Sequence, residues 1–246
     1  MTFAASPGTL NSHGTLRKYF PIPEDFCYKL PDDSGLDEAV LVEPLAVAVH
    51  AARLADVRVG MNVVVFGAGT VGLLSSKVAI AMGAAKVVCV DLNSFRLEFA
   101  QKYLGAASGI FLPSSSDSAE ETSQKILEAH SLPSDGADVV LEATGAEPCI
   151  EAGIHVLRSG GTFVQAGLGK AKIQFPIVAL SEKELNMKGS FRYNYGDYDL
   201  AMHLLESQKV SVKELITGVE PFELATEAWE RSKRGEGIKN LIRGPD

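Results

Sequence analysis

Three glycines in the first half of the chain could bring a phosphate against the backbone. They form the run Gly67-Ala-Gly-Thr-Val-Gly72, which has the spacing of a dinucleotide-binding turn. The apolar run Val63-Val-Val-Phe66 comes directly before it, and apolar residues at helical spacing follow over residues 74–82. A buried strand therefore leads through this turn into a helix, whose free N–H groups and positive dipole end can hold a pyrophosphate.

Each glycine has its own part in such a turn. Gly67 allows the tight bend, Gly69 lets a phosphate approach the backbone, and Gly72 lets the helix pack closely on the strand. Asp91 ends the next apolar run, 19 residues after Gly72, where a carboxylate accepts the ribose hydroxyls of NAD and repels the 2′-phosphate of NADP. A strand-end aspartate that caps a turn is the alternative, but the order of these features favours NAD. Arg96, on the following helix, is either a neighbour of the adenosine or a solvated charge.

Apolar runs and amphipathic segments alternate around this turn. The alternation is typical of right-handed crossover units and predicts an α/β fold, a Rossmann doubly wound parallel sheet. The expected strands lie at residues 63–66, 86–91, 109–112, 137–141 and 161–165, with a sixth at 186–191. The expected helices between them lie at residues 74–82, 94–104, 118–130 and 147–157. Ser94 is expected to cap the second helix, and Ser118 with Glu121 has the spacing of a capping box.

The two ends of the chain have a different pattern. The first 40 residues are rich in Pro, Gly and Asp and predict short strands at 14–20 and 26–30. After residue 193 the sequence predicts two helices, at 197–207 and 224–234, and a terminal strand near 240–242.

Composition restricts the class of protein. The 246 residues carry a formal net charge of −8, with 46% hydrophobic and 22% charged residues, which excludes a disordered chain or a disulfide scaffold. The acidic balance argues against a nucleic-acid partner. The most apolar stretch, residues 63–90, contains Lys77 and Lys86 and does not predict a membrane span.

Cysteine usage and the N-terminus predict a reducing, cytoplasmic location. Cys27, Cys89 and Cys149 are odd in number, lie far apart and form no Cys-x-x-Cys motif. The residues after Met1 contain neither a charged segment nor a long apolar segment, so we expect no secretory signal.

A dinucleotide fold does not by itself give a reaction. A short-chain dehydrogenase would need a Tyr-x-x-x-Lys pair, and no tyrosine of this chain has a lysine four residues later. That class is excluded.

Six segments, in order along the chain, resemble the zinc-dependent medium-chain polyol dehydrogenases, the family of xylitol and sorbitol dehydrogenases. These segments are Phe26-Cys-Tyr-Lys-Leu-Pro31, Glu43-Pro-Leu-Ala-Val-Ala-Val-His50, Gly67-Ala-Gly-Thr-Val-Gly72, Gly160-Gly-Thr-Phe-Val164, Gly189-Ser-Phe-Arg-Tyr193 and Lys213-Glu-Leu-Ile-Thr217. The resemblance covers nearly the whole chain.

The resemblance implies a domain plan and a reaction. Residues 1–44 would be a remnant of a GroES-like β-rich catalytic domain, residues 45–190 the NAD-binding Rossmann domain, and residues 191–246 the return to the catalytic domain. The implied reaction is oxidation of a polyol, xylitol to D-xylulose or sorbitol to fructose, by hydride transfer to NAD with zinc polarising the alcohol.

The resemblance also implies site residues. Glu43 would face the zinc and the substrate, and Arg192 and Tyr193 would border the substrate and the nicotinamide. The cofactor would be held by Gly67, Gly69, Val71, Gly72, Asp91, Arg96, Ala166, Gly167, Leu168 and Phe191. Without the resemblance, Glu43 is better explained as an acid at a helix start, and Arg192 and Tyr193 as a domain-interface pair. His50 is expected to be packed against other residues rather than bound to a metal.

The chain departs from the family at the metal. The family's zinc is also held by a Cys and a His-Glu pair, and a second zinc by four cysteines, all upstream of the first matching segment. No His-Glu dipeptide occurs here, so Glu43 belongs to an incomplete metal site and we expect a truncated form that tends to form homo-oligomers. Two alternatives remain open: a non-catalytic NAD(H)-binding module, and a zinc-independent oxidoreductase such as a quinone reductase.

Overall fold

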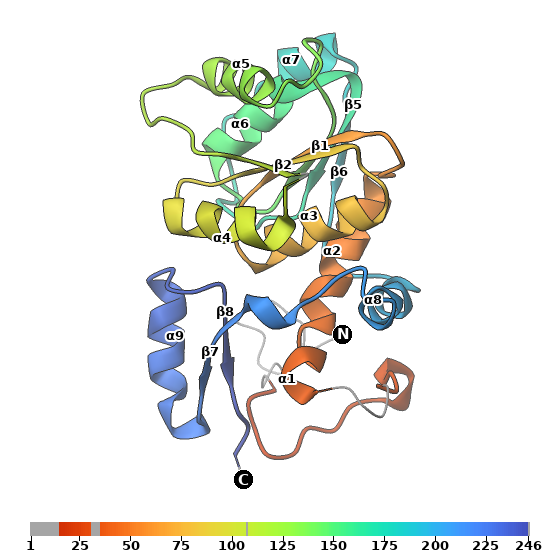
Figure 1. Cartoon of the computed structure of the whole chain (residues 1–246), viewed down its shortest axis with the longest axis vertical. Coiled ribbons are helices and arrows are strands. Elements are labelled where there is room, and N and C mark those ends of the chain that lie inside the picture. Colours follow the sequence, from red (N-terminus) through yellow and green to blue (C-terminus); the bar gives the residue numbers. More distant parts are fainter. Residues whose placement is uncertain (1–14, 31–34, 107, 246) are drawn as a thin grey trace. The chain divides into compact units, whose positions relative to one another are not determined.

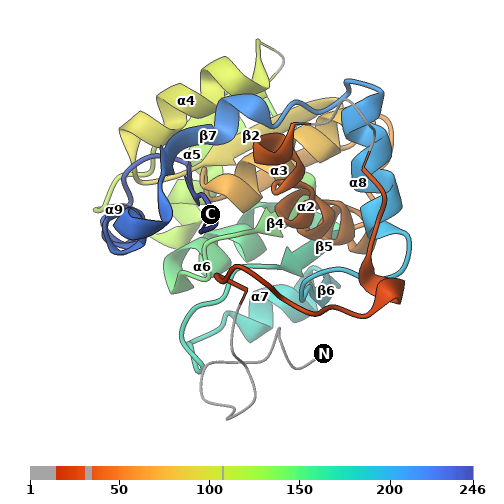
Figure 2. The same cartoon turned by 90° about the horizontal axis from the view of Figure 1, so that it is seen from below.

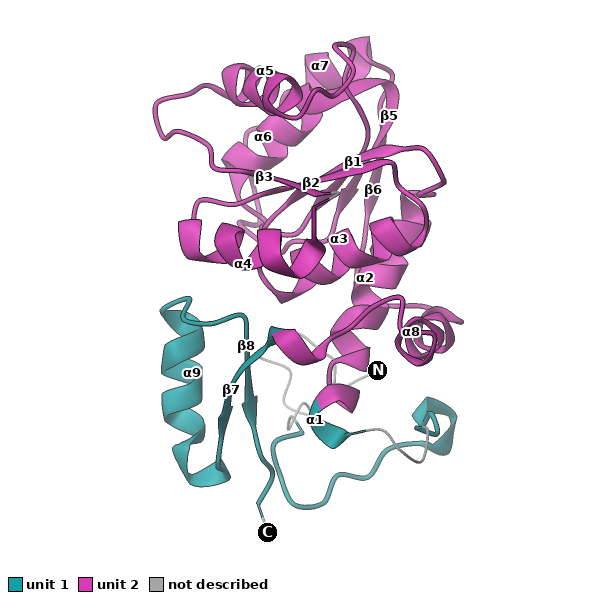
Figure 3. Cartoon of the chain, in the orientation of Figure 1, with its two compact units in different colours: residues 1–37, 215–246 teal, residues 38–214 magenta. Residues whose placement is uncertain are grey.

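The computed structural model describes residues 15–30, 35–106 and 108–245. The chain forms two compact units, shown in different colours in Figure 3. One comprises Glu38–Glu214, and the other combines Met1–Asp37 with Leu215–Asp246. Gly14, where the first expected strand begins, lies outside the described residues, as does the turn expected after Leu30.

A six-stranded sheet forms the centre of the larger unit. Its strand order is β3-β2-β1-β4-β5-β6, and every neighbouring pair is parallel, which confirms the Rossmann prediction. The strands are β1 (Asn62–Phe66), β2 (Lys86–Val90), β3 (Ser108–Phe111), β4 (Ala137–Glu142), β5 (Leu157–Gln165) and β6 (Asn186–Gly189). The central strands are almost wholly buried because helices cover both faces, which is why they read as unbroken apolar runs.

Helices cover both faces of this sheet. Figure 1 shows α5, α6 and α7 on one face and α2, α3 and α4 on the other, and α8 packs beside α2 in both views (Figures 1 and 2). These helices are α2 (Val42–Leu54), α3 (Thr70–Ala81), α4 (Ser94–Leu104), α5 (Ala119–Ala129), α6 (Glu147–Val156), α7 (Ile177–Glu182) and α8 (Asp197–Glu206). A short helix, α1 (Leu36–Ala39), precedes α2.

Two helix caps test the sequence reasoning. The capping box of α5 is confirmed: Glu121 N donates to Ser118 Oγ at 3.2 Å, and Ser118 N donates to Glu121 Oε2 at 2.9 Å. The prediction for α4 was wrong by one residue, because Asn93 caps that helix and accepts from Arg96 N at 3.2 Å. Both side chains favour the cap position, and Asn93 is the one with extended backbone geometry.

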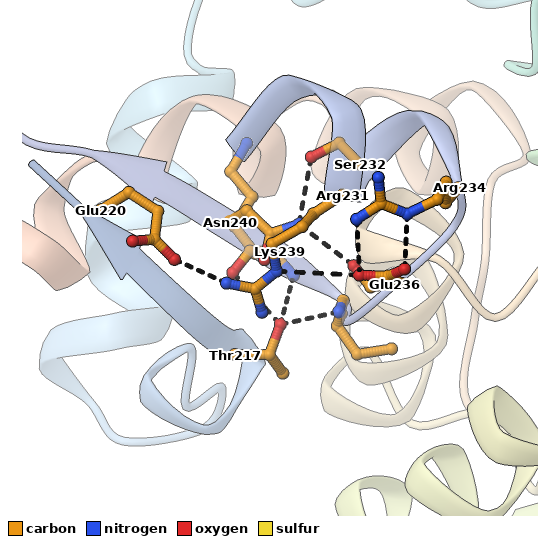
Figure 4. A network of polar contacts seen from close by, with 9 residues as sticks. Thr217, Glu220, Arg231, Ser232, Arg234, Glu236, Lys239 and Asn240 are labelled. Carbon is orange, nitrogen blue, oxygen red and sulfur yellow. Dashed lines mark hydrogen bonds and ion pairs between the residues drawn. The ribbon is translucent and has the colours of Figure 1, made fainter. Parts of the chain in front are cut away.

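The smaller unit is built on a parallel strand pair, β7 (Ile216–Glu220) and β8 (Lys239–Ile242), with α9 (Ala225–Lys233) between them in sequence. Figure 4 shows the polar network that joins these elements: Arg231 pairs with Glu220 at 2.6 Å, and Thr217 Oγ1 accepts from Ile238 N at 2.8 Å. The strands expected at 14–20 and 26–30 were wrong where the structure describes them, since residues 15–30 hold only a short 3-10 helix, Glu24–Phe26. No described segment pairs with these residues as a sheet neighbour, and an isolated strand has no ladder to stabilise it.

Candidate functional site

The turn between β1 and α3 requires glycine at two positions. Gly67 has φ +106°, a conformation that side chains rarely adopt. A Cβ at Gly72 would lie 1.8 Å from the carbonyl oxygen of Gly67, so any larger residue would push the helix off the turn. Gly69 precedes the first helical residue, and a Cβ there would meet open space. This is the geometry of a backbone turn that an external group can approach.

Asp91 is hydrogen-bonded to the glycine turn. Its Oδ2 accepts from Ala68 N at 2.7 Å, and its Oδ1 accepts from Asn93 N at 2.8 Å. Each carboxylate oxygen has a second acceptor direction, so both remain able to bind ribose hydroxyls. The turn offers an open backbone approach, and the acid offers free acceptor directions beside it.

The loops after β1, β4 and β5 meet at one edge of the sheet. Ala143 N donates to Phe66 O at 2.9 Å, and Ala166 N and Gly167 N both donate to Glu142 O at 2.8 Å. The strand order reverses between β1 and β4, and ligands of such sheets bind outside the carboxyl ends of strands at that point.

The remaining cofactor residues predicted from the sequence lie around this edge. Ala166 and Gly167 are half-buried, while Leu168 is 81% exposed. Val71 is half-buried in the first turn of α3, and Arg96 is half-buried in the first turn of α4.

Phe191, Arg192 and Tyr193 lie on the loop between β6 and α8. Arg192 has φ +59°, in the left-handed region that residues other than glycine seldom occupy. Its guanidinium carbon lies 5.4 Å from the centre of the Phe191 ring, and the Tyr193 ring lies edge-on to Tyr198 at 4.8 Å. Strained residues persist where surrounding contacts fix them, often at functional sites.

Asp197, which sequence reasoning missed, holds the later part of this loop. The side chain is fully buried at the start of α8 and accepts from Asn194 N at 2.6 Å, within the loop. It also accepts from Arg53 Nη1 at 2.6 Å and from His50 Nδ1 at 2.8 Å, both on α2. His50 is therefore packed against another residue, as the sequence suggested, and that residue is a carboxylate that the sequence did not predict.

Glu43 lies half-buried in the first turn of α2. His50 is seven residues further along the helix, about 10 Å along the axis at 1.5 Å per residue. Among the described contacts, the loop of Arg192 is joined to α2 through His50 and Arg53, at the opposite end of the helix from Glu43. The structure thus brings the glycine turn, Asp91 and residues 166–168 to the same edge of the sheet.

The described residues do not bring together the donors that a catalytic zinc needs. A catalytic zinc needs three protein ligands, and over residues 15–30, 35–106 and 108–245 no three His, Cys, Asp or Glu side chains cluster so as to hold a metal. Within the same ranges no helix has the length and apolar character needed to cross a membrane.

Comparison with known proteins identifies the family. The sequence model described as zinc-binding dehydrogenase matches residues 70–207. The chain is 55% identical over 246 residues to D-xylulose reductase A of Aspergillus oryzae, and 54% identical to D-xylulose reductase A of Aspergillus niger. Both matches cover 100% of this chain and 67% of the relative.

Solved structures agree with these sequence matches. The chain superposes on an Escherichia coli oxidoreductase/dehydrogenase of unknown specificity with a TM-score of 0.85 and 29% identity, covering 97% of this chain and 66% of that one. It superposes on 2R,3R-butanediol dehydrogenase from Bacillus subtilis with a TM-score of 0.78 and 28% identity, covering 89% and 60%. The chain therefore spans about two thirds of the length of its relatives. On this evidence, the chain belongs to the zinc-binding dehydrogenase family, a family of oxidoreductases built on the Rossmann fold found here.

Proposed function

We propose that this chain binds NAD(H) and belongs to an NAD-dependent polyol dehydrogenase that oxidises xylitol to D-xylulose, with sorbitol as the related substrate. The observation that carries the cofactor assignment is the hydrogen bond from Ala68 N to Asp91, which fixes an acid beside the glycine turn. The substrate assignment rests on the D-xylulose reductases that match the whole chain.

In this proposal the pyrophosphate would rest on Gly67, Gly69 and Gly72, with Val71 beside them and Asp91 on the adenosine ribose. Arg96 would lie along the adenosine, and residues 166–168 with Phe191 would back the nicotinamide. When bound, NAD supplies the hydride acceptor. Glu43 would face the substrate, and Arg192 and Tyr193 would border it. The division at 1–44, 45–190 and 191–246 belongs to the same proposal.

No step is assigned to a zinc ion, because Glu43 is the one donor that the family pattern transfers to this chain. One carboxylate does not complete a three-ligand site. The polyol loses a hydride to the nicotinamide and a proton to solvent or to a general base.

Two measurements test the proposal in order. NADH binding, followed by nicotinamide fluorescence, should be saturable in the wild-type chain and weakened at least tenfold in Asp91→Ala, with NADPH binding less tightly than NADH in the wild type. Tighter binding of NADPH would overturn the cofactor assignment. Xylitol-dependent NADH formation with zinc supplied, and sorbitol as the comparison, then tests the reaction.

A non-catalytic NAD(H)-binding module is the second candidate, and it is favoured because no three metal-ligating side chains cluster among the described residues. It predicts NADH binding without turnover of either polyol. The dehydrogenase predicts turnover that Arg192→Ala abolishes while leaving NADH affinity unchanged.

The proposal includes a homo-oligomer in the cytoplasm. All four residues of the edge strand β6 are exposed, and an open strand edge can pair with a second copy. Light scattering should give the mass of a dimer or larger, and Met187→Pro on this edge should lower it. A monodisperse wild-type monomer would contradict the assembly.

A further inference from the structure

Glu142 is a fully buried acid at the carboxyl end of β4, between the two loops that the cofactor proposal uses. Its Oε1 accepts from Thr144 N at 2.8 Å and from the Thr144 hydroxyl, and its Oε2 accepts from Gly145 N at 2.9 Å. Gln165 Nε2, on β5, donates to Oε2 at 2.5 Å. Every one of these partners is a donor, which is the pattern of a carboxylate that accepts at both oxygens.

The backbone carbonyl of Glu142 also holds the loop of residues 166–168. Ala166 N and Gly167 N both donate to its carbonyl oxygen at 2.8 Å, and Gln165 Nε2 also donates to Gly167 O at 2.8 Å. Gly167 packs directly on the acid, because a Cβ there would lie 2.7 Å from Glu142 Oε2 and 2.2 Å from Gly145 N. A single glycine therefore separates the carboxylate from the surface that residues 166–168 present.

The charge of Glu142 is stabilised by the N–H and O–H groups that donate to it. None of the lysines, arginines or histidines in the described part of the chain forms an ion pair with it. A buried charge that hydrogen bonds stabilise but no cation neutralises acts over a longer range than an exposed one, because little solvent screens it.

We propose that Glu142 is a positioning residue with a second effect: it orders residues 143–146 and 166–168 against the cofactor, and its negative charge favours the oxidised cofactor over the reduced one. The inference rests on the proposed NAD site. The nicotinamide ring is positively charged in NAD and neutral in NADH, so a carboxylate behind Gly167 stabilises the first selectively. The Coulomb energy between two charges falls inversely with their separation and with the effective dielectric constant, so we expect a change of about tenfold in this preference.

The test compares binding of NAD and NADH by titration calorimetry in three forms of the full chain. Glu142→Gln keeps the shape and removes the charge, so the ratio Kd(NAD)/Kd(NADH) should rise about tenfold. Gln165→Met keeps the charge and removes one donor, so both Kd values should rise by the same factor. A purely structural role for Glu142 predicts an unchanged ratio in Glu142→Gln, and that result would overturn the proposal.

A further variant tests the same charge effect if the Glu142→Gln chain does not fold. Gln165→Lys places an ammonium beside Oε2 and neutralises the carboxylate in place, so it should raise the same ratio. An unchanged ratio in folded Gln165→Lys would also contradict the inference. Failure of the proposed function is distinct, because it would appear as absence of NADH binding in the wild-type chain.

Discussion

His50 and Asp197, which stand 147 positions apart in the sequence, form a hydrogen bond of 2.8 Å between Nδ1 and Oδ2. The carboxylate is fully buried, and Arg53 Nη1 and Asn194 N also donate to it. This single acid joins α2 to the loop that holds Arg192 in a left-handed conformation.

Replacing this acid should loosen the loop. Asp197→Asn keeps the volume but turns a donor toward groups that already donate, and unpairing a buried charge cluster costs about 3 kcal/mol. We expect a fall of that size in the free energy of unfolding, measured with urea, and faster hydrogen exchange at residues 191–196. Asp199→Asn, on the same turn but exposed, should change stability by less than about 1 kcal/mol. Equal effects of the two variants would contradict this prediction.

Two glycines of the turn should affect different properties: Gly72 the stability of the fold, and Gly69 the binding of NADH. Gly72→Ala places a Cβ 1.8 Å from Gly67 O and should destabilise the unit by about 2 kcal/mol or more, seen as a lower midpoint of thermal unfolding. Gly69→Ala meets no atom within 4 Å and should keep the wild-type midpoint. The new methyl group would occupy the path of the phosphate, so NADH affinity should fall at least tenfold. Wild-type affinity in Gly69→Ala would argue against a phosphate at this turn.

Alkaline pH should destabilise the larger unit through Cys89. Burial raises the pKa of this thiol from 9.0 to about 12 in the folded chain. Between these values the unfolded chain releases a proton that the folded chain retains, so the free energy of unfolding falls by about 1.4 kcal/mol per pH unit. Urea unfolding at a series of pH values should show that this pH dependence of the free energy of unfolding disappears in Cys89→Ala. Cys27→Ala, at an exposed site, should keep the wild-type slope.

Lys183 stabilises the junction between α6 and β5. Its Nζ donates to the carbonyl oxygens of His155 at 2.5 Å and Ile154 at 3.4 Å, which have no helical partners in the last turn of α6. It also donates to the carbonyl oxygen of Leu157, the first residue of β5, at 2.8 Å. Lys183→Met keeps the aliphatic stem and removes all three bonds, so stability should fall by about 2 kcal/mol. The exposed Lys172→Met serves as the control and should be neutral. Thermal unfolding compares the two, and matching midpoints would refute the role given to Lys183.

Local sequence patterns predicted the helices and strands of the larger unit, because each of these elements is determined by residues that are close together in the sequence. The capping box at Ser118 and Glu121, the glycine spacing and the apolar runs each depend on neighbours within a few residues. The error at Ser94 shows the limit of this reasoning: two adjacent side chains both suit a cap, and only the backbone conformation distinguishes them.

No local sequence pattern predicted the roles of Glu142 and Asp197. An acid that ends an apolar strand could have drawn attention to Glu142, but its partner Gln165 is 23 positions away and on another strand. Asp197 resembles an ordinary first-turn acid of α8 until His50 and Arg53 are seen beside it.

The sequence alone determined the dinucleotide turn, the acid that follows it and the parallel sheet, because short-range periodicity and glycine geometry dictate them. The tertiary structure decided which buried acids fix the loops at the edge of the sheet. A carboxylate can be buried only where donors from distant segments converge on it, and that convergence exists only once the chain has folded.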